Sequence, residues 1–130
     1  MPPPRINPGS PVNNNGVSSV GTVEFVTAAD FRQKVLEAEG PVAVEFMSFA
    51  CGYCRLANPM VHDVARGLGE RVKIFQVNVP QDQELSGEYR IRATPTFVMF
   101  ENGREVGRSN PELTPIGIRT AILAPFAERP

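Results

Sequence analysis

Residues 42–54 read VAVEFMSFACGYC, and this stretch predicts a buried strand that leads directly into a helix. Residues 42–47 form a near-continuous apolar run, which is typical of a strand inside a parallel sheet covered on both faces. Cys51 and Cys54 follow where the strand gives way to the helix. Open α/β sheets usually place their sites beyond the carboxyl ends of strands, so we expect a functional site here.

The segment before this stretch predicts one strand and one helix. Residues 23–26 form a short strand candidate, and Thr27 to Asp30 resembles a capping box that starts a helix. Gly40-Pro41 would end that helix before the next strand. Its buried face is expected to carry Ala28, Phe31, Val35 and Ala38.

The segment after the cysteines predicts a long helix and a further strand. Pro59 lies inside the helix over residues 52–69 and predicts a kink there. Residues 72–79 alternate in hydrophobicity as a strand does. The apolar positions at helical spacing are Leu56, Met60, Val61, Val64 and Leu68.

The C-terminal part predicts a short helix over 82–89, a strand over 95–101, a hairpin and a last helix. Asn102-Gly103 between two strand-like runs is a strong hairpin signal, because both residues tolerate positive φ. Thr114 as N-cap and Pro115 as the first helical residue open the last helix. That helix carries Ile118, Ile122 and Phe126, and Pro125 marks its frayed end.

The order of these elements predicts an α/β fold with a central mixed sheet and helices on both faces. Strands that alternate with helices favour right-handed crossovers, and the hairpin adds antiparallel strands. A chain of 130 residues with 42% apolar residues suits one domain, which we assign to residues 22–130. Residues 1–21 are rich in Pro, Asn, Gly and Ser without apolar periodicity. We expect a disordered spacer tail there, with a partner-binding arm as the alternative.

Composition excludes several classes of partner. The formal net charge of -1 offers no basic surface for phosphate contacts, so we expect no nucleic-acid partner. No apolar stretch approaches the roughly 20 residues of a membrane helix, so we expect no membrane span. The opening residues lack the apolar core of a secretory signal, which favours a cytoplasmic protein. A periplasmic or exported location would follow if a signal had been removed.

The two cysteines form a Cys-X-X-Cys pair, which near a strand-helix-strand pattern indicates redox chemistry. Cys51 at the helix N-terminus would face unpaired N–H groups and the positive end of the helix dipole, which favour its thiolate. We therefore predict Cys51 as the nucleophile and Cys54, one turn further in, as the resolving thiol. Gly52 permits close backbone approach, and Tyr53 offers a partly polar ring to a substrate.

Two other interpretations of the cysteine pair are weaker. A zinc site needs further ligands, and the rise along a helix from Cys54 to the one histidine, His62, is about 12 Å, too far for one ion. Two inert packing cysteines are poorly placed at a strand-to-helix junction.

Glu45 interrupts the apolar strand, and a buried carboxylate is costly unless it is paired or its pKa rises. A raised pKa would suit a proton shuttle that takes the Cys54 proton through a water. The alternative is a glutamate at a sheet edge in ordinary solvent.

Residues 23–126 combine the strand with Glu45, Cys51-Gly52-Tyr53-Cys54, Pro59, residues 91–96 and the turn at 100–103. With these motifs the segment resembles a thioredoxin-family domain, and the resemblance implies a thioredoxin-like fold. By this resemblance Glu45 matches the family's buried acid and Pro95 its cis-proline. Thr94 would then offer its backbone to an extended substrate segment, as in strand addition.

The chain departs from the thioredoxin pattern in several places. Ala50 replaces the usual Trp and Tyr53 the usual Pro, whereas Gln76 stands where a lysine is common. Ser109-Asn110-Pro111 replaces a Gly-containing substrate loop. The Cys-Gly-Tyr-Cys motif with Thr94 before the proline is also similar to periplasmic disulfide isomerases.

The predicted function is dithiol-disulfide exchange with protein substrates, as a thioredoxin-like reductant without a bound cofactor or metal. It requires an upstream redox partner, either a reductase or an oxidant, and we expect a monomer. A disulfide oxidant or isomerase is one alternative. A thioredoxin-fold binding module whose cysteines do not turn over is the other.

Overall fold

The computed structural model describes residues 20–126. Of the predicted tail, residues 1–19 lie outside the described residues, while Val20 and Gly21 form a turn. The strands are β1 (Val23–Phe25), β2 (Pro41–Met47), β3 (Lys73–Asn78), β4 (Thr96–Glu101) and β5 (Arg104–Ser109). The α-helices are α1 (Gly52–Leu68), α2 (Gln83–Glu88) and α3 (Pro115–Leu123). Short helical turns are π-helical at Arg32–Leu36 and 3-10 at Gly69–Arg71, Val79–Gln81 and Ala124–Phe126.

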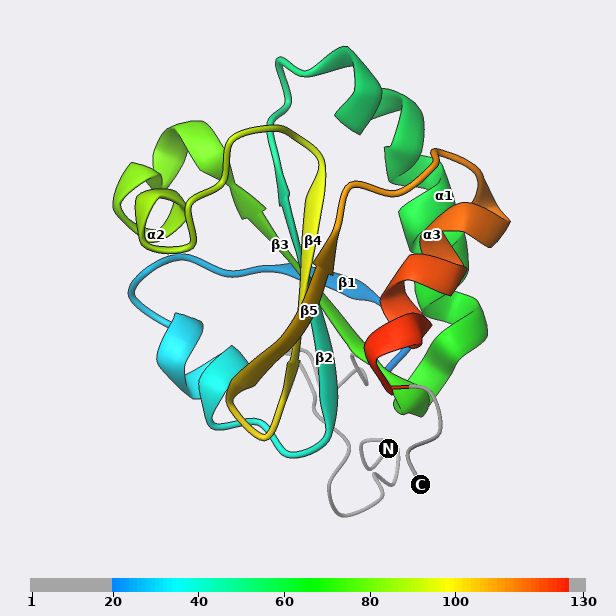
Figure 1. The fold of residues 1–130 in the computed structure, drawn as a ribbon, viewed down its shortest axis with the longest axis horizontal. Coiled ribbons are helices and arrows are strands. Elements are labelled where there is room, and N and C mark those ends of the chain that lie inside the picture. Colours follow the sequence, from blue (N-terminus) through cyan, green and yellow to red (C-terminus); the bar gives the residue numbers. More distant parts are fainter. Residues whose placement is uncertain (1–19, 127–130) are drawn as a thin grey trace, which may run out of the picture.

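The five strands form one mixed sheet in the order β1-β3-β2-β4-β5 (Figure 1). β3 pairs in parallel with both β1 and β2, whereas β4 runs antiparallel to β2 and to β5. The prediction of a mixed sheet is thereby confirmed. β2 is the central strand of the sheet. The residues that follow its carboxyl end, which include Cys51, therefore lie near the middle of one end of the sheet.

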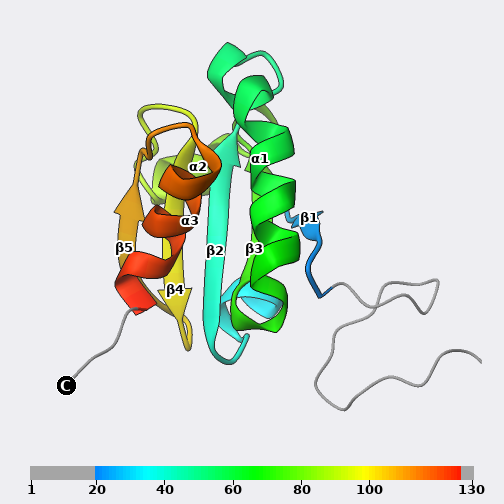
Figure 2. The same cartoon turned by 90° about the vertical axis from the view of Figure 1, so that its right-hand side faces the viewer.

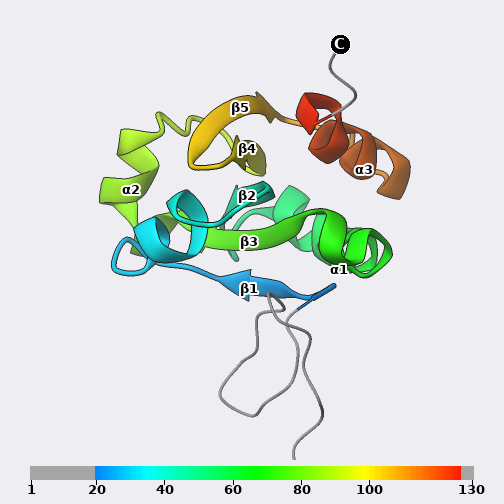
Figure 3. The ribbon, with the colours of Figure 1, turned by 90° about the horizontal axis from the view of Figure 1, so that it is seen from below.

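Helices cover both faces of this sheet. Figures 2 and 3 show α1 and α3 on one face, and Figure 3 shows α2 with the π-helical turn on the other. Because side chains alternate along a strand, Val44 of β2 packs with the α2 side and Ala43 with the α1 side. By the same alternation Glu45 faces α1.

The hairpin between β4 and β5 confirms the Asn102-Gly103 prediction. Both residues have positive φ, +52° and +82°, as a tight turn between twisted strands requires. The Asn102 Oδ1 atom also accepts a hydrogen bond of 3.0 Å from the Gly40 N–H, which ties this turn to the start of β2. The predicted cap of the last helix is present as well, since Thr114 Oγ1 accepts from the Gly117 N–H at 2.9 Å.

One predicted core position, Ala28, is wrong, and Leu56 lies off the buried face of α1 despite its helical spacing. Ala28 is exposed, because Thr27 to Asp30 forms a turn and the helical segment begins only at Arg32. The Asp30 carboxylate still accepts the Thr27 N–H at 2.7 Å, so the acid of the predicted capping box stabilises a turn. Leu56 is 57% exposed. It lies about 200° around α1 from buried Cys54, away from the face that packs on the sheet.

No helix in residues 20–126 is long and apolar enough to cross a membrane.

Pro59 lies inside α1, which continues through it from Gly52 to Leu68.

Candidate active site

Cys51 is the N-cap residue of α1, at the point where the chain leaves the carboxyl end of β2. Its backbone is extended, and its Sγ accepts a hydrogen bond of 3.2 Å from the Cys54 N–H. A sulfur in this position satisfies one of the N–H groups that a helix leaves unpaired at its start. Cys51 is partly exposed and Cys54 is buried, and both are free thiols.

The two thiols differ in acidity. Burial raises the pKa of the Cys51 thiol, but hydrogen bonds from the Cys54 side chain, from Thr94 and from the backbone outweigh it, so the pKa lies below its usual value. Burial, followed by the hydrogen bond to Cys51, raises the pKa of the Cys54 thiol to about 11. The accessible sulfur is therefore the one that ionises more easily.

Thr94 and Pro95 lie beside the cysteines. The Thr94–Pro95 peptide bond is cis, and the Thr94 carbonyl oxygen is 3.5 Å from Cys51 Sγ. Among residues 20–126 the Thr94 N–H makes no hydrogen bond. A backbone N–H beside a reactive sulfur is therefore open to a peptide that lies alongside.

Apolar side chains are exposed around Cys51. Tyr53 is 68% exposed and Phe49 56%, and Leu56 follows one turn along α1. Gly52 is also exposed. The Arg55 guanidinium donates to the Phe49 carbonyl oxygen at 2.8 Å and holds the loop that leads into the cysteines.

Glu45 lies beneath α1 and is fully buried. Its Oε1 accepts a hydrogen bond of 2.8 Å from Gln76 Nε2, and the same nitrogen donates to Asn58 Oδ1 at 3.0 Å. Glu45 and Gln76 are register partners on adjacent parallel strands, which places both side chains on the same face of the sheet. Asn58 lies one helical turn beyond Cys54, so this polar cluster sits next to the resolving cysteine's face of α1.

The Glu45 carboxyl group has few hydrogen bonds to compensate for its lost hydration. Burial raises its pKa to about 7, against the lowering effect of the Gln76 hydrogen bond. Its Oε2 is buried and accepts no hydrogen bond within the part of the chain that the structure describes. The group can therefore hold or release a proton near neutral pH.

The structure brings the sequence-predicted residues to one end of the sheet in two groups. Cys51, Cys54, Thr94 and Pro95 are in contact or adjacent, with Gly52 and Tyr53 on the exposed side. Glu45 belongs to the second group, which is buried below α1 and also contains Gln76 and Asn58.

Sequence reasoning missed two contributors. Asn58 escaped notice because it looks like any polar residue within an amphipathic helix, although its spacing of four from Cys54 could have placed it on the buried face. In the sequence Asn110 stands out only as a departure from the thioredoxin pattern, yet its side chain donates hydrogen bonds to Pro95 and Thr96. Among residues 20–126, no cluster of three His, Cys, Asp or Glu side chains could hold a metal ion.

Comparisons with known proteins agree with this geometry. The sequence model of the thioredoxin family matches residues 22–123. A thioredoxin of Pseudomonas aeruginosa is 35% identical over 104 residues, which cover 79% of this chain and 91% of the relative. Thioredoxin 1 of Synechococcus elongatus is 38% identical over 81 residues, or 62% of this chain and 76% of the relative.

Solved structures show the same fold. The Malassezia sympodialis thioredoxin superposes with a TM-score of 0.72 at 28% identity, covering 82% of this chain and 93% of the other. A mutant thioredoxin from Halobacterium salinarum gives a TM-score of 0.73 at 21% identity, covering 85% and 96%. The chain belongs to the thioredoxin family and is a thiol-disulfide oxidoreductase.

Proposed function

We propose that this protein reduces disulfide bonds in other proteins through reversible oxidation of Cys51 and Cys54. The observation that carries the proposal is the position of Cys51 Sγ at the N-cap of α1, 3.2 Å from the Cys54 N–H and 3.5 Å from the Thr94 carbonyl. A reactive thiolate there lies beside backbone that can receive a peptide. The relatives' names as thioredoxins favour the reducing direction.

In the first step the Cys51 thiolate attacks one sulfur of a substrate disulfide. The substrate S–S bond breaks and a mixed disulfide forms between Cys51 and that sulfur. The other substrate sulfur leaves as a thiolate and takes a proton from solvent. Thr94 and Pro95 would align the substrate backbone, while Gly52 and Tyr53 provide exposed contact surface.

In the second step Cys54 loses its proton and attacks Cys51 Sγ. A Cys51–Cys54 disulfide forms, and the second substrate sulfur leaves as a thiolate, so the substrate gains two electrons and the pair loses two. Cys54 needs a base because its pKa is about 11. Glu45, with a pKa of about 7, would accept the proton through a water.

An upstream dithiol would return the pair to the reduced state, and the mechanism uses no bound cofactor. The Thr94 N–H, which makes no hydrogen bond among residues 20–126, supports protein disulfides as the substrates. The monomeric state and the cytoplasmic location remain predictions from the sequence.

The reduction potential of the Cys51–Cys54 pair tests the direction. The protein is equilibrated in dithiothreitol and glutathione buffers, and the disulfide fraction is measured after acid quenching and thiol labelling. We expect a reduction potential of about -270 mV, as for a reductant. A value of about -120 to -180 mV would assign the protein to the oxidants or isomerases instead.

Two single variants control this measurement. Cys51→Ser should abolish exchange, whereas Cys54→Ser should accumulate the mixed disulfide, since Cys51 can still attack but nothing resolves it. A wild-type protein that forms no reversible disulfide would contradict the enzymatic function and leave a binding module.

A further inference from the structure

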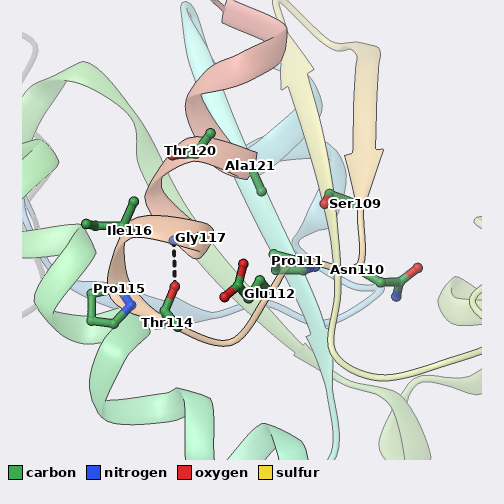
Figure 4. A pocket seen from close by; sticks show the side chains of 10 residues that line it. All are labelled: Ser109, Asn110, Pro111, Glu112, Thr114, Pro115, Ile116, Gly117, Thr120 and Ala121. Atoms are coloured by element: carbon green, nitrogen blue, oxygen red, sulfur yellow. Dashed lines mark hydrogen bonds between the residues drawn. The ribbon is translucent and has the colours of Figure 1, made fainter.

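The side chain of Asn110 connects the loop after β5 to the segment beside Cys51. Asn110 lines a surface hollow with nine other residues of the stretch from Ser109 to Ala121 (Figure 4). Its amide points away from Thr114 and Gly117, which form the opposite side of that hollow. The amide nitrogen instead donates to the Pro95 carbonyl oxygen at 3.0 Å and to Thr96 Oγ1 at 2.7 Å.

The hydrogen bond to Pro95 takes the place of a backbone hydrogen bond between β4 and β5. The β4–β5 ladder ends at the pair Phe97 and Ser109. Beyond it the same register would place Pro95 opposite Pro111, and Pro111 has no N–H to donate to the Pro95 carbonyl oxygen, so the regular backbone ladder cannot continue there. The Asn110 side chain supplies the missing donor.

The same hydrogen bonds continue toward Cys51. Thr96 Oγ1, which accepts from Asn110, donates in turn to the Ala93 carbonyl oxygen at 2.5 Å. Asn110 therefore holds the chain on both sides of Thr94, directly at Pro95 and through Thr96 at Ala93. Thr94, between these two points, has its carbonyl oxygen 3.5 Å from Cys51 Sγ and its N–H free among the described residues.

We propose that Asn110 is a positioning residue for substrate docking: its amide fixes the segment 93–96 against β5, so that the Thr94 backbone is pre-organised beside Cys51. This inference rests on the proposed function, because it concerns how a protein disulfide reaches the same sulfur. A segment held in its bound conformation loses less entropy when a partner pairs with it. Among residues 20–126, Asn110 makes no hydrogen bond to either cysteine sulfur.

The test compares a protein disulfide with a small one in single turnovers of the pre-reduced protein. Insulin carries a polypeptide backbone that can pair with Thr94, whereas bis(2-hydroxyethyl) disulfide has no backbone to dock. Asn110→Asp keeps the shape but places an acceptor against the Pro95 carbonyl, and Asn110→Ala removes both donors. Asn102→Asp is the matched control, because it makes the same chemical change at the far end of β4 and still accepts from Gly40.

For both Asn110 variants we expect the rate constant with insulin to fall about tenfold, the effect of losing two ordinary hydrogen bonds that are partly exposed to water. The rate constant with the small disulfide and the pH profile of Cys51 alkylation should stay within about twofold of wild type. Asn102→Asp should change neither rate. Thermal unfolding of each variant checks that the fold is retained.

Two results would overturn the proposal. An equal fall with both disulfides would mean that Asn110 acts on Cys51 or on folding and does not position substrate. Unchanged insulin rates in both Asn110 variants would mean that the segment 93–96 is held well enough without it. A wild-type protein that reduces neither disulfide would instead contradict the proposed function itself, and this inference with it.

Discussion

Glu45 lies on the α1 side of β2, where a carboxylate has little to compensate its lost hydration. The Gln76 amide supplies one hydrogen bond, and the second oxygen accepts none among residues 20–126. Burial dominates and raises the pKa to about 7. A group suited to proton transfer at neutral pH is therefore also a group that destabilises the fold once it ionises.

The first residue-scale prediction concerns Glu45→Gln. The folded protein keeps Glu45 protonated up to about pH 7, whereas the unfolded chain releases that proton near the ordinary value of 4.5. Stability should therefore fall as pH rises between these values, by about 3 kcal/mol in all. Glu45→Gln should remove this fall and be more stable than wild type at pH 8, as measured by urea unfolding from pH 4 to 9. Equal pH slopes in the two proteins would contradict a raised pKa.

Gln76 carries the second residue-scale prediction, because its amide donates to both Glu45 and Asn58. Gln76→Met keeps the length but loses both hydrogen bonds, so the pKa of Glu45 should rise above about 7 and stability should fall by about 1–3 kcal/mol. NMR titration of the Glu45 carboxyl carbon measures the pKa. Asn58→Ala is the control, since it spares the Glu45 hydrogen bond and should shift that pKa less.

At the scale of elements, the β4–β5 hairpin depends on Gly103. Its φ of +82° strains any other residue, and a Cβ there would clash with the Leu36 carbonyl oxygen. The turn therefore lies tightly against the end of the π-helical segment. Local turn preference and tertiary contact both demand glycine at this position.

We predict that Gly103→Ala lowers the free energy of unfolding by about 2–4 kcal/mol, because backbone strain and a clash with backbone add together. Chemical denaturation measures the loss. Gly87→Ala is the matched control in α2, where an added Cβ meets nothing within 4 Å. There helix propensity should leave stability unchanged or raise it by up to about 1 kcal/mol. Similar losses at both glycines would contradict this explanation.

At the scale of the whole molecule, stability centres on β2. This strand is buried at every residue except Pro41, and hydrophobic clusters cover both of its faces. β5, in contrast, is mostly exposed and, within residues 20–126, pairs only with β4. Charged residues along such an edge strand also oppose pairing with other chains.

Hydrogen exchange should reflect this arrangement. We expect the amides of β2 and of its neighbours β3 and β4 to exchange only through global unfolding, and those of β5 to exchange faster by local opening. Exchange followed by NMR at two pH values, to verify that opening is at equilibrium, measures both classes. Amides of β5 among the slowest would contradict a stability centred on β2.

Much of the fold follows from local patterns. The apolar run at 42–47, the Asn102-Gly103 turn and the Thr114 cap each depend on neighbours in sequence, and the structure confirms all three. Ala28 is exposed although the pattern predicts it on a buried face, and Leu56 is exposed although it shares the helical spacing of the buried positions of α1. Helical spacing shows that a face exists, but the side of the helix that meets the sheet depends on tertiary packing.

The sequence by itself therefore determined the elements, the Cys51–Cys54 pair and the presence of one acid in a buried strand, because strand and helix periods, turn residues and helix caps act over a few residues. Only the tertiary structure decided what surrounds them. Thr94 meets Cys51 across 43 positions of sequence and Gln76 meets Glu45 across 31. Such contacts depend on the strand order β1-β3-β2-β4-β5, which the packing of all the elements sets together and no short stretch of sequence encodes.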